Sequence, residues 1–314
     1  MEISLMLAEQ ILSLVLICIV GFLITYFKII SSAESRVISR ICVYVIIPCS
    51  MINAFQTELD QARLSGLGLA FVGAILIHMM YLGATKLLDV AKVPLDNVER
   101  ASIIYNNAGN LVIPMVAGTL GTEYIFYTSA YIAVQNFLMW SHGQIIMGVP
   151  NGKSNFKKIF KNPCMISIFI GVSLFLFQIK IPGAVGIAIS SSAACLGPLS
   201  MLMIGMMLGE QNLKKIFSSL KVYRIVVIRL ILYPLLTMIV LFILSKLWVH
   251  NDINNILLVS LLCAIGPSAA TVAQQAQLYD HPLKVYVSSI NVVSTSLCAI
   301  TMPLMALLFQ FILS

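Results

Sequence analysis

The chain has 314 residues, of which 60% are hydrophobic and only 10% charged, and its mean hydropathy is +0.98. Because an average soluble domain carries about 25% charged residues, this composition excludes a water-soluble globular protein and indicates a chain surrounded by the lipid bilayer. The net charge of +7 suggests no nucleic-acid partner, since basic residues in a membrane protein mark its orientation.

An apolar run of roughly 17 to 25 residues is long enough to cross a bilayer as a helix. The sequence therefore predicts an all-α integral membrane protein with ten transmembrane helices at residues 6–27, 37–55, 67–88, 101–120, 124–147, 165–179, 187–208, 225–247, 256–278 and 285–313. No Lys or Arg precedes the first run, so we interpret it as a retained span and not as a signal peptide. A polar linker at 150–163 separates a first half, 1–149, from a second half, 164–314.

The basic residues are distributed unequally between the two sides of the predicted membrane. Fifteen of the 19 fall on one side and three, Arg63, Lys180 and Lys246, fall on the other. The remaining one, Arg229, lies just inside the eighth span next to the fifteen. Because short cytoplasmic loops carry an excess of Lys and Arg, we expect a multi-pass plasma-membrane protein with both termini extracytoplasmic.

Several kinds of chemistry lack their sequence signals. The seven cysteines form no CxxC pair and have no histidine at metal-ligand spacing, so neither a disulfide framework nor a zinc site is predicted. The spans contain no HExxH, no paired aspartates and no nucleophile with an adjacent base, which argues against a membrane-embedded enzyme. We expect no cofactor.

An internal repeat relates the two halves. The second span reads PCSMI at 48–52 and the seventh reads PLSML at 198–202. Five spans separate the two copies, and an odd number of spans makes the second copy enter the membrane from the opposite face. This pattern predicts two inverted five-helix repeats, an arrangement found in many secondary transporters.

The fourth and ninth spans are polar and interrupted at corresponding places in the two halves. Residues 105–114 read YNNAGNLVIP and residues 265–275 read IGPSAATVAQQ. Proline removes a backbone donor, and each carboxamide in a membrane needs a partner. Such paired broken helices point to a transporter's binding site, where half-helix N-termini present partial positive charge. A pair of proline kinks with amides bonded to neighbouring helices is the structural alternative.

The chemistry of the spans favours an anionic substrate. No Asp or Glu lies in the middle of any span, whereas amides, hydroxyls and helix N-termini suit a carboxylate. Sodium coupling stays open, because backbone carbonyls together with Asn106, Ser268, Thr271 and Gln274 can ligate a hard cation. Proton coupling through His78 or His142 is a second alternative, although a hydrogen-bonded structural histidine is the favoured interpretation at each position.

These features together resemble the auxin efflux carrier family, which includes plant auxin carriers and bacterial permeases for malate and similar acids. The resemblance rests on the stretches 107–114, 266–270 and 278–280 and on 291–303 in the last span. It implies the fold of the bile-acid sodium symporters, with a scaffold made of spans 1, 2, 6 and 7, and a transport domain made of spans 3–5 and 8–10. It also implies a homodimer and elevator-type alternating access.

The resemblance also implies which residues contact the substrate carboxylate. Asn107 and Asn110 in the fourth span and Pro267 and Ser268 in the ninth occupy the matching positions, while Asn106 stands where the plant carriers have a proline. The full predicted binding set comprises Asn106, Asn107, Asn110, Pro114, Gln135, Asn136, Pro267, Ser268, Thr271, Gln274, Ser50 and Asn53. Hydrogen bonding between helices is the alternative role for Gln135 and Asn136, and close helix packing is the alternative for Ser50 and Asn53.

The predicted function is therefore secondary transport of small organic anions, such as malate-like or auxin-like carboxylates. Two other functions remain open on sequence grounds. One is a sodium- or proton-coupled symporter of the bile-acid type. The other is a sensor or channel that uses the same site without carrier-type transport.

Overall fold

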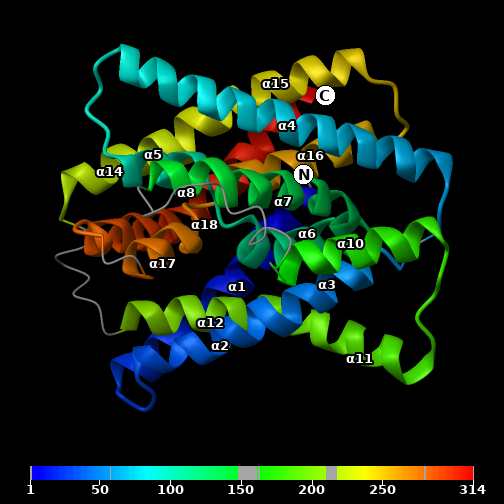
Figure 1. Ribbon diagram of the computed structural model, residues 1–314, viewed down its shortest axis with the longest axis horizontal. Helices are drawn as coiled ribbons and strands as arrows, with labels where there is room; N and C mark the ends of the chain where they lie inside the picture. Colours follow the sequence, from blue (N-terminus) through cyan, green and yellow to red (C-terminus); the bar gives the residue numbers. More distant parts are fainter. Residues whose placement is uncertain are drawn as a thin grey trace.

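A computed structural model describes residues 2–56, 58–147, 161, 163–209, 218–278 and 281–313. The described chain is helical and contains no β-strand (Figure 1). The α-helices are α1 (Glu2–Tyr26), α2 (Ser35–Ile41), α3 (Ile47–Ala54), α4 (Gln61–Val90), α5 (Asn97–Ile104), α6 (Ile113–Thr119), α7 (Ile125–Leu138), α8 (Gln144–Ile146), α10 (Pro163–Leu176), α11 (Gly183–Ala194), α12 (Leu196–Gly209), α14 (Leu220–Val227), α15 (Tyr233–Leu247), α16 (Ile253–Ile265), α17 (Ala270–Leu278) and α18 (Lys284–Leu313).

Short 3₁₀ turns stand at η1 (Ser32–Glu34) and η4 (Thr122–Tyr124). Wider π-helical turns stand at η2 (Cys42–Ile46), η3 (Ala108–Val112), η5 (Met139–Gly143) and η6 (Ile228–Leu232). The predicted linker at 150–163 lies outside the described residues except for positions 161 and 163.

Each of the ten predicted apolar segments is helical where the structure describes it, and the fourth and ninth are interrupted as expected. By length and hydropathy, three described helices are able to cross a membrane: Gln61–Val90, Gly183–Met203 and Leu220–Leu247. A pair bent by 53°, Val285–Cys298 and Ile300–Leu313, makes a fourth if counted as one span. The all-α membrane protein is thus confirmed, whereas the count of ten spans stays a prediction, because several of the predicted spans consist of shorter helices.

Prolines explain three of the four π-helical turns. Pro48, Pro114 and Pro234 each follow a π-helical turn by two positions, and each lacks the N–H that would bond the carbonyl four residues earlier. Those carbonyls belong to the central residues of η2, η3 and η6. The bend in α18 has the same cause, because Pro303 stands four residues after the break between Cys298 and Ile300.

The helices form two groups in Figure 1. The lower group comprises α1, α2, α3, α10, α11 and α12, of which α2, α3, α11 and α12 lie lowest in the view. The upper group comprises α4, α5, α7 and α14 to α18, of which α4 and α15 lie highest, whereas α1, α10 and α17 reach the middle of the view. Within the lower group α1 packs along α12, and α10 and α11 pack on α3. The groups meet where α6 contacts α1 and α12, where η3 contacts α12, where α18 contacts α1, and where α7 contacts α3 and α10.

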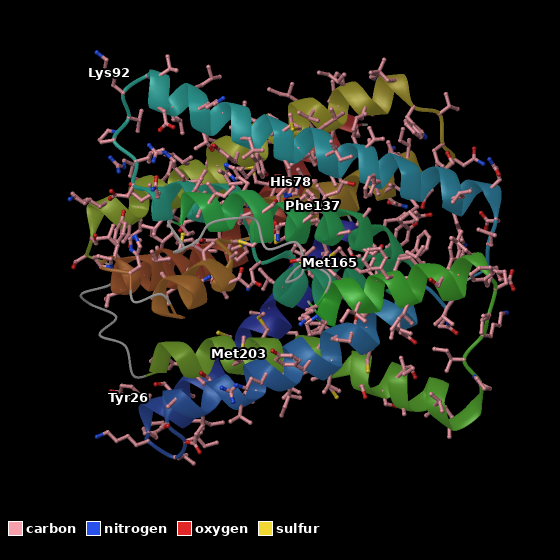
Figure 2. The ribbon with its side chains drawn as sticks, viewed as in Figure 1. Tyr26, His78, Lys92, Phe137, Met165 and Met203 are labelled. Carbon is pink, nitrogen blue, oxygen red and sulfur yellow. The ribbon has the colours of Figure 1, made fainter. Side chains whose placement is uncertain are left out.

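The connections between helices gather at two opposite ends. The α1–α2 and α4–α5 connections lie at one end, where Figure 2 shows Tyr26 and Lys92, and the start of α14 lies there too. The α3–α4, α10–α11 and α15–α16 connections lie at the other end. Most helices therefore run between these two ends, as expected for helices aligned with a membrane normal.

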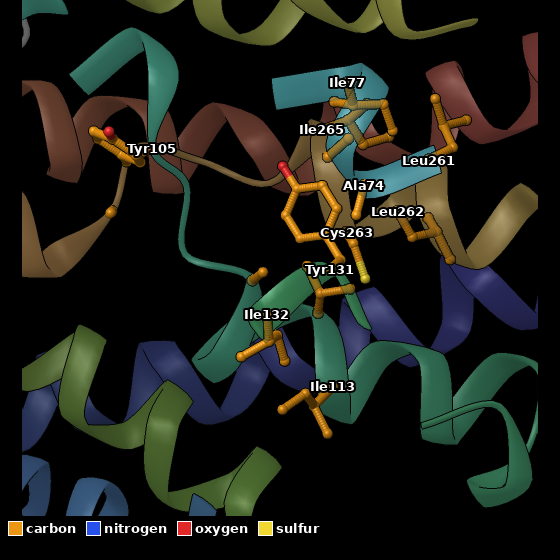
Figure 3. Close-up of a cluster of buried hydrophobic side chains, with 14 of the residues drawn as sticks. Ala74, Ile77, Tyr105, Ile113, Tyr131, Ile132, Leu261, Leu262, Cys263 and Ile265 are labelled. Carbon is orange, nitrogen blue, oxygen red and sulfur yellow. The ribbon is translucent and has the colours of Figure 1, made fainter. Parts of the chain in front are cut away.

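The core of the upper group is built around Tyr131 of α7. Figure 3 shows its ring beside Ala74 of α4 and Cys263 of α16, with Ile77 of α4 above it. All four residues are at most 1% exposed. This packing fixes α16, and with it the start of the break in the ninth predicted span, against two long helices.

Candidate functional site at the helix crossing

The two interrupted helices meet at their breaks through their backbones. Asn106 and Ser268 form an antiparallel bridge outside any strand. The Asn107 amide donates to the Pro267 carbonyl at 2.9 Å, and the Ala269 amide donates to the Tyr105 carbonyl at 3.0 Å. Backbone groups freed by the two breaks thus satisfy each other, which is how unwound backbone is tolerated inside an apolar protein.

Asn106 is fully engaged in holding this junction. Its Nδ2 lies 3.0 Å from the Tyr131 hydroxyl and 2.6 and 2.9 Å from the carbonyls of Cys263 and Ala264. Its Oδ1 accepts from the amide of Ala108 at 3.0 Å. Since the residue is 1% exposed, its carboxamide ties the start of the second half-helix to the end of α16.

Gln135 of α7 supports the same residue from the other side. Its Nε2 donates to the Asn106 carbonyl at 2.9 Å, and its Oε1 accepts from the Asn106 amide at 3.3 Å. A side-chain amide therefore completes the backbone bonding that the break left open. This contact is a hydrogen bond between helices, one of the two roles predicted for Gln135.

Ser268 is the counterpart at the second break. Its amide donates to Ser294 Oγ at 3.2 Å, and its carbonyl accepts from Asn291 Nδ2 at 2.7 Å, so α18 holds its backbone. Its own hydroxyl is buried and has no hydrogen-bond partner within the described structure. A buried hydroxyl without a partner is costly unless a ligand or water completes it.

Asn107 differs from Asn106 in the surroundings of its side chain. It is 7% exposed, and none of the hydrogen bonds formed by described side chains involves its carboxamide. In extended backbone, successive side chains point to opposite sides, which explains why Asn106 faces the helix packing while Asn107 does not share those partners. Asn107 and Ser268 thus retain hydrogen-bonding capacity at the crossing.

The other predicted residues occupy varied positions. Thr271 is exposed, Asn136 is half-buried on α7, and on α3 Ser50 is buried and Asn53 half-buried. None of the hydrogen bonds found among described residues joins these four to the crossing. The side chains of Asn110, Pro114 and Gln274 lie outside the described side chains, although their backbones belong to the interrupted helices.

Arg229 is the main residue of the crossing that the sequence analysis missed. It lies in η6, is 0% exposed, and its guanidinium donates to the carbonyls of Ile103, Ala264 and Gly266. Its Cζ also stands 5.4 Å from the centre of the Tyr81 ring. The sequence signal was present, because an ionisable residue inside an apolar span points to a functional position, but the position of Arg229 next to the basic loops made it look like an orientation signal.

A polar network behind Arg229 joins α4 to α15. The Tyr81 hydroxyl contacts Thr237 Oγ1 at 2.9 Å and the Ala264 carbonyl at 3.1 Å, and the Tyr233 hydroxyl contacts Thr85 Oγ1 at 2.7 Å. Because every member has a partner in the low-dielectric interior, this network stiffens the wall of the crossing.

The two histidines of the spans have different surroundings. Nδ1 of His142 lies 2.8 Å from the Tyr105 hydroxyl, a structural hydrogen bond at the first break. His78 is buried on α4, with Nδ1 2.8 Å from the Ala74 carbonyl and its ring 4.7 Å from that of Tyr131. Its Nε2 has no partner in the described structure.

Comparison with known proteins identifies the class of molecule to which this site belongs. The sequence profile of a family described as membrane transport protein, the auxin efflux carrier family, matches residues 6–306. The chain belongs to this family. The match covers nearly the whole chain and confirms the resemblance seen in the short polar motifs. A search of curated proteins finds no match.

Membership in this transport family gives the crossing its functional context. The chain is a membrane transport protein, and in transporters unwound backbone inside the membrane lines substrate or ion sites. The two breaks, where unwound backbone meets the buried polar residues Asn106, Asn107 and Ser268, are therefore the candidate transport site.

Proposed function

We propose that this family member is a secondary carrier of small organic anions, such as mono- or dicarboxylates, and that the anion binds at the crossing. The observation that carries the proposal is the antiparallel junction of the two helix breaks, beside which Asn107 and Ser268 have unused hydrogen-bonding capacity. No metal or cofactor takes part in this proposal.

The electrostatics of the crossing favour an anion. The helical run that starts at Ala108 and continues through α6, and the helix α17, both begin at the junction, so two helix N-termini with partial positive charge face it. Arg229 adds a buried positive charge. Neither 101–122 nor 253–278 contains Asp or Glu, so no carboxylate in these segments opposes the negative charge of a substrate.

Helix packing supports the proposed inverted repeat. Under a five-span inversion, the first span corresponds to the sixth and the second to the seventh. The contact between α1 and α12 then corresponds to that between α10 and α3, and both pairs pack together. The fourth and ninth spans, which also correspond under this inversion, are both interrupted by non-helical backbone, at 105–107 and 266–269.

The two helix groups support the proposed elevator motion. The lower group in Figure 1 matches the predicted scaffold of spans 1, 2, 6 and 7, and the upper group matches the predicted transport domain. The half of the fourth span that follows its break, η3 and α6, faces α1 and α12 across the boundary. An anion bound there would lie where a moving domain slides along a scaffold.

The test is substrate counterflow in proteoliposomes. Purified protein is reconstituted with unlabelled malate inside, and entry of labelled malate is followed, with citrate, acetate and indole-3-acetate as competitors. We expect saturable, trans-stimulated uptake that falls about tenfold or more in Asn107→Ala and in Ser268→Ala, the scale of one hydrogen bond to a charged ligand.

Matched controls separate site effects from general damage. Ser289→Ala removes a hydroxyl that bonds the Val285 carbonyl of its own helix, and Asn254→Ala removes an exposed carboxamide at the start of α16. Both are expected to transport normally. Unchanged counterflow in the double variant Asn107→Ala/Ser268→Ala would show that the anion binds elsewhere, and conductance without exchange would indicate a channel.

A further inference from the structure

Arg229 binds the C-terminal ends of α5 and α16, the two helices that lead into the breaks. Its Nη1 donates to the Ile103 carbonyl, next to the end of α5, at 3.0 Å. Its Nε donates to the Gly266 carbonyl, just past the end of α16, at 2.9 Å, and its Nη2 donates to Ala264. One side chain therefore caps the helix that leads into each break.

The crossing contains four helix ends with opposite partial charges. The C-termini of α5 and α16 carry partial negative charge, and the N-termini of the helices that follow carry partial positive charge. Because the guanidinium binds the two negative ends, the two positive ends remain for a ligand. Among the described residues, no carboxylate lies within ion-pair distance of Arg229, so its charge is balanced within the protein only by carbonyl dipoles and the Tyr81 ring.

A cluster of carbonyl oxygens at unwound helix ends is also what a hard cation such as Na⁺ requires. Here these oxygens are already occupied. Arg229 and Asn106 both donate to Ala264, and Asn106 also donates to Cys263. Asn106 Oδ1, an oxygen expected to ligate sodium, accepts from the Ala108 amide instead, and Thr271 is exposed.

The local sequence explains how a charged side chain reaches this place. Pro234 has no N–H for the Leu230 carbonyl, and the helix passes through the π-helical turn η6 there. A π-helical turn inserts an extra residue and changes the direction in which the following side chains project. Arg229 is the second residue of this turn, and its burial is sustained by its bonds to three carbonyls.

We propose that Arg229 is a built-in cation of the crossing, a positioning residue that occupies the carbonyl cluster a coupling cation would need and so makes anion binding independent of sodium. The part of this inference that concerns anion binding rests on the proposed function. The part that concerns the carbonyl cluster does not, because cation dependence of stability is measurable without any substrate.

The first measurement is thermal unfolding of the full-length purified protein in detergent, with NaCl exchanged for choline chloride. We expect the melting temperature of the wild type to be the same in both salts. Arg229→Ala removes the donor to the Ile103 and Gly266 carbonyls and one of several donors to the Ala264 carbonyl, and is expected to melt at lower temperature. Guanidinium chloride at low millimolar concentration, far below denaturing levels, is expected to raise the melting temperature of this variant and not that of the wild type.

The matched control is Arg100→Ala. Arg100 pairs with Asp89 at 2.8 Å near the protein surface, so its removal also deletes a guanidinium but leaves no buried carbonyl cluster. Guanidinium is expected to leave its melting temperature unchanged. An equal rescue of both variants would overturn the proposal, because the effect would then be nonspecific.

Arg229→Lys keeps the proposal testable if Arg229→Ala does not fold. Lysine retains the charge, but its compact ammonium does not reproduce the planar fork that spans three carbonyls. We expect a folded protein whose malate affinity is about tenfold weaker and whose counterflow still does not respond to sodium. Wild-type affinity in this variant would contradict the positioning role.

Sodium dependence in the wild type would also overturn the inference, whether it appears as a higher melting temperature or as faster counterflow in NaCl than in choline chloride. The two proposals fail separately. If no anion exchanges but the melting pattern holds, the proposed function is wrong and the built-in cation stands. If anions exchange and the exchange depends on sodium, the proposed function stands and the built-in cation is wrong.

Discussion

Asn106 and Asn107 are neighbours of the same residue type, yet their surroundings assign them different tasks. The carboxamide of Asn106 is buried among Tyr131, Cys263 and Ala264, whereas that of Asn107 has no hydrogen-bond partner among the side chains that the structure describes. Sequence analysis placed both in the substrate site because both are amides in an apolar span. The two carboxamides have different partners because the backbone between α5 and η3 is not helical. A pattern of residue types in the sequence does not predict that local geometry.

This difference predicts separable mutant effects. Asn106→Ala leaves the buried Cys263 carbonyl without its donor and is expected to lower unfolding stability by about 2 kcal/mol. Asn107→Ala is expected to change stability by less than about 0.5 kcal/mol, while weakening malate binding. Melting curves recorded with and without malate check both effects. The assignment is wrong if Asn107→Ala proves to be the less stable variant.

At the scale of elements, prolines decide where helices depart from regular geometry. Pro48, Pro114 and Pro234 each follow a π-helical turn, and Pro303 follows a bend, always with the irregularity four residues earlier. The breaks at 105–107 and 266–269 were predictable because their residues are poor helix formers in lipid. The π-helical turns were not predicted, although the prolines that accompany three of them were visible in the sequence.

Pro234→Ala tests the link between η6 and the crossing. The new N–H at position 234 can bond the Leu230 carbonyl, which favours a regular α-helix and turns Arg229 by about 100° relative to α15. We expect counterflow to fall about tenfold while helical content, measured by circular dichroism, stays the same. Pro282→Ala, in the exposed turn before α18, serves as the control and is expected to transport normally.

The pairing of α1 with α12 is a second element-scale feature that depends on close approach. A Cβ added at Gly205 would collide with the Cys18 carbonyl, and one added at Gly209 would lie 2.7 Å from the Phe22 carbonyl. Both glycines stand on one face of α12, four residues apart, which lets the two backbones touch as in membrane helix pairs with small residues.

Gly205→Ala is therefore expected to destabilise the protein by about 1 to 3 kcal/mol, the range for overpacking a filled interface. Gly83→Ala is the control, because an added Cβ there meets no atom within 4 Å. Thermal unfolding of the two variants gives the comparison. Equal stability would mean that α1 and α12 separate without cost.

At the scale of the whole molecule, composition and apolar run length predicted an all-helical membrane protein, and the short polar motifs predicted its transport family. The structure adds the joining of distant parts, such as Arg229 with Ile103 and Gly266. These contacts link the fourth, eighth and ninth predicted spans and depend on tertiary packing, so no local pattern encodes them.

The predicted orientation is testable by cysteine labelling in a background where the exposed Cys195 is replaced by serine. Lys92 and Val249 are exposed in connections at opposite ends of the molecule. We expect Lys92→Cys to react with an impermeant maleimide only in inside-out vesicles and Val249→Cys only in right-side-out vesicles. The opposite labelling pattern would reverse the predicted topology.

The unopposed charge of Arg229 has a consequence for how membrane voltage acts on the cycle. If the proposed motion carries the crossing across the membrane, an empty site moves with one positive charge, whereas a site holding a monoanion moves with none. Each elementary charge crossing 100 mV corresponds to about 2.3 kcal/mol. A potential that is negative inside would thus act on the return of the empty site, drawing it toward the cytoplasm and leaving it ready to load an anion for export.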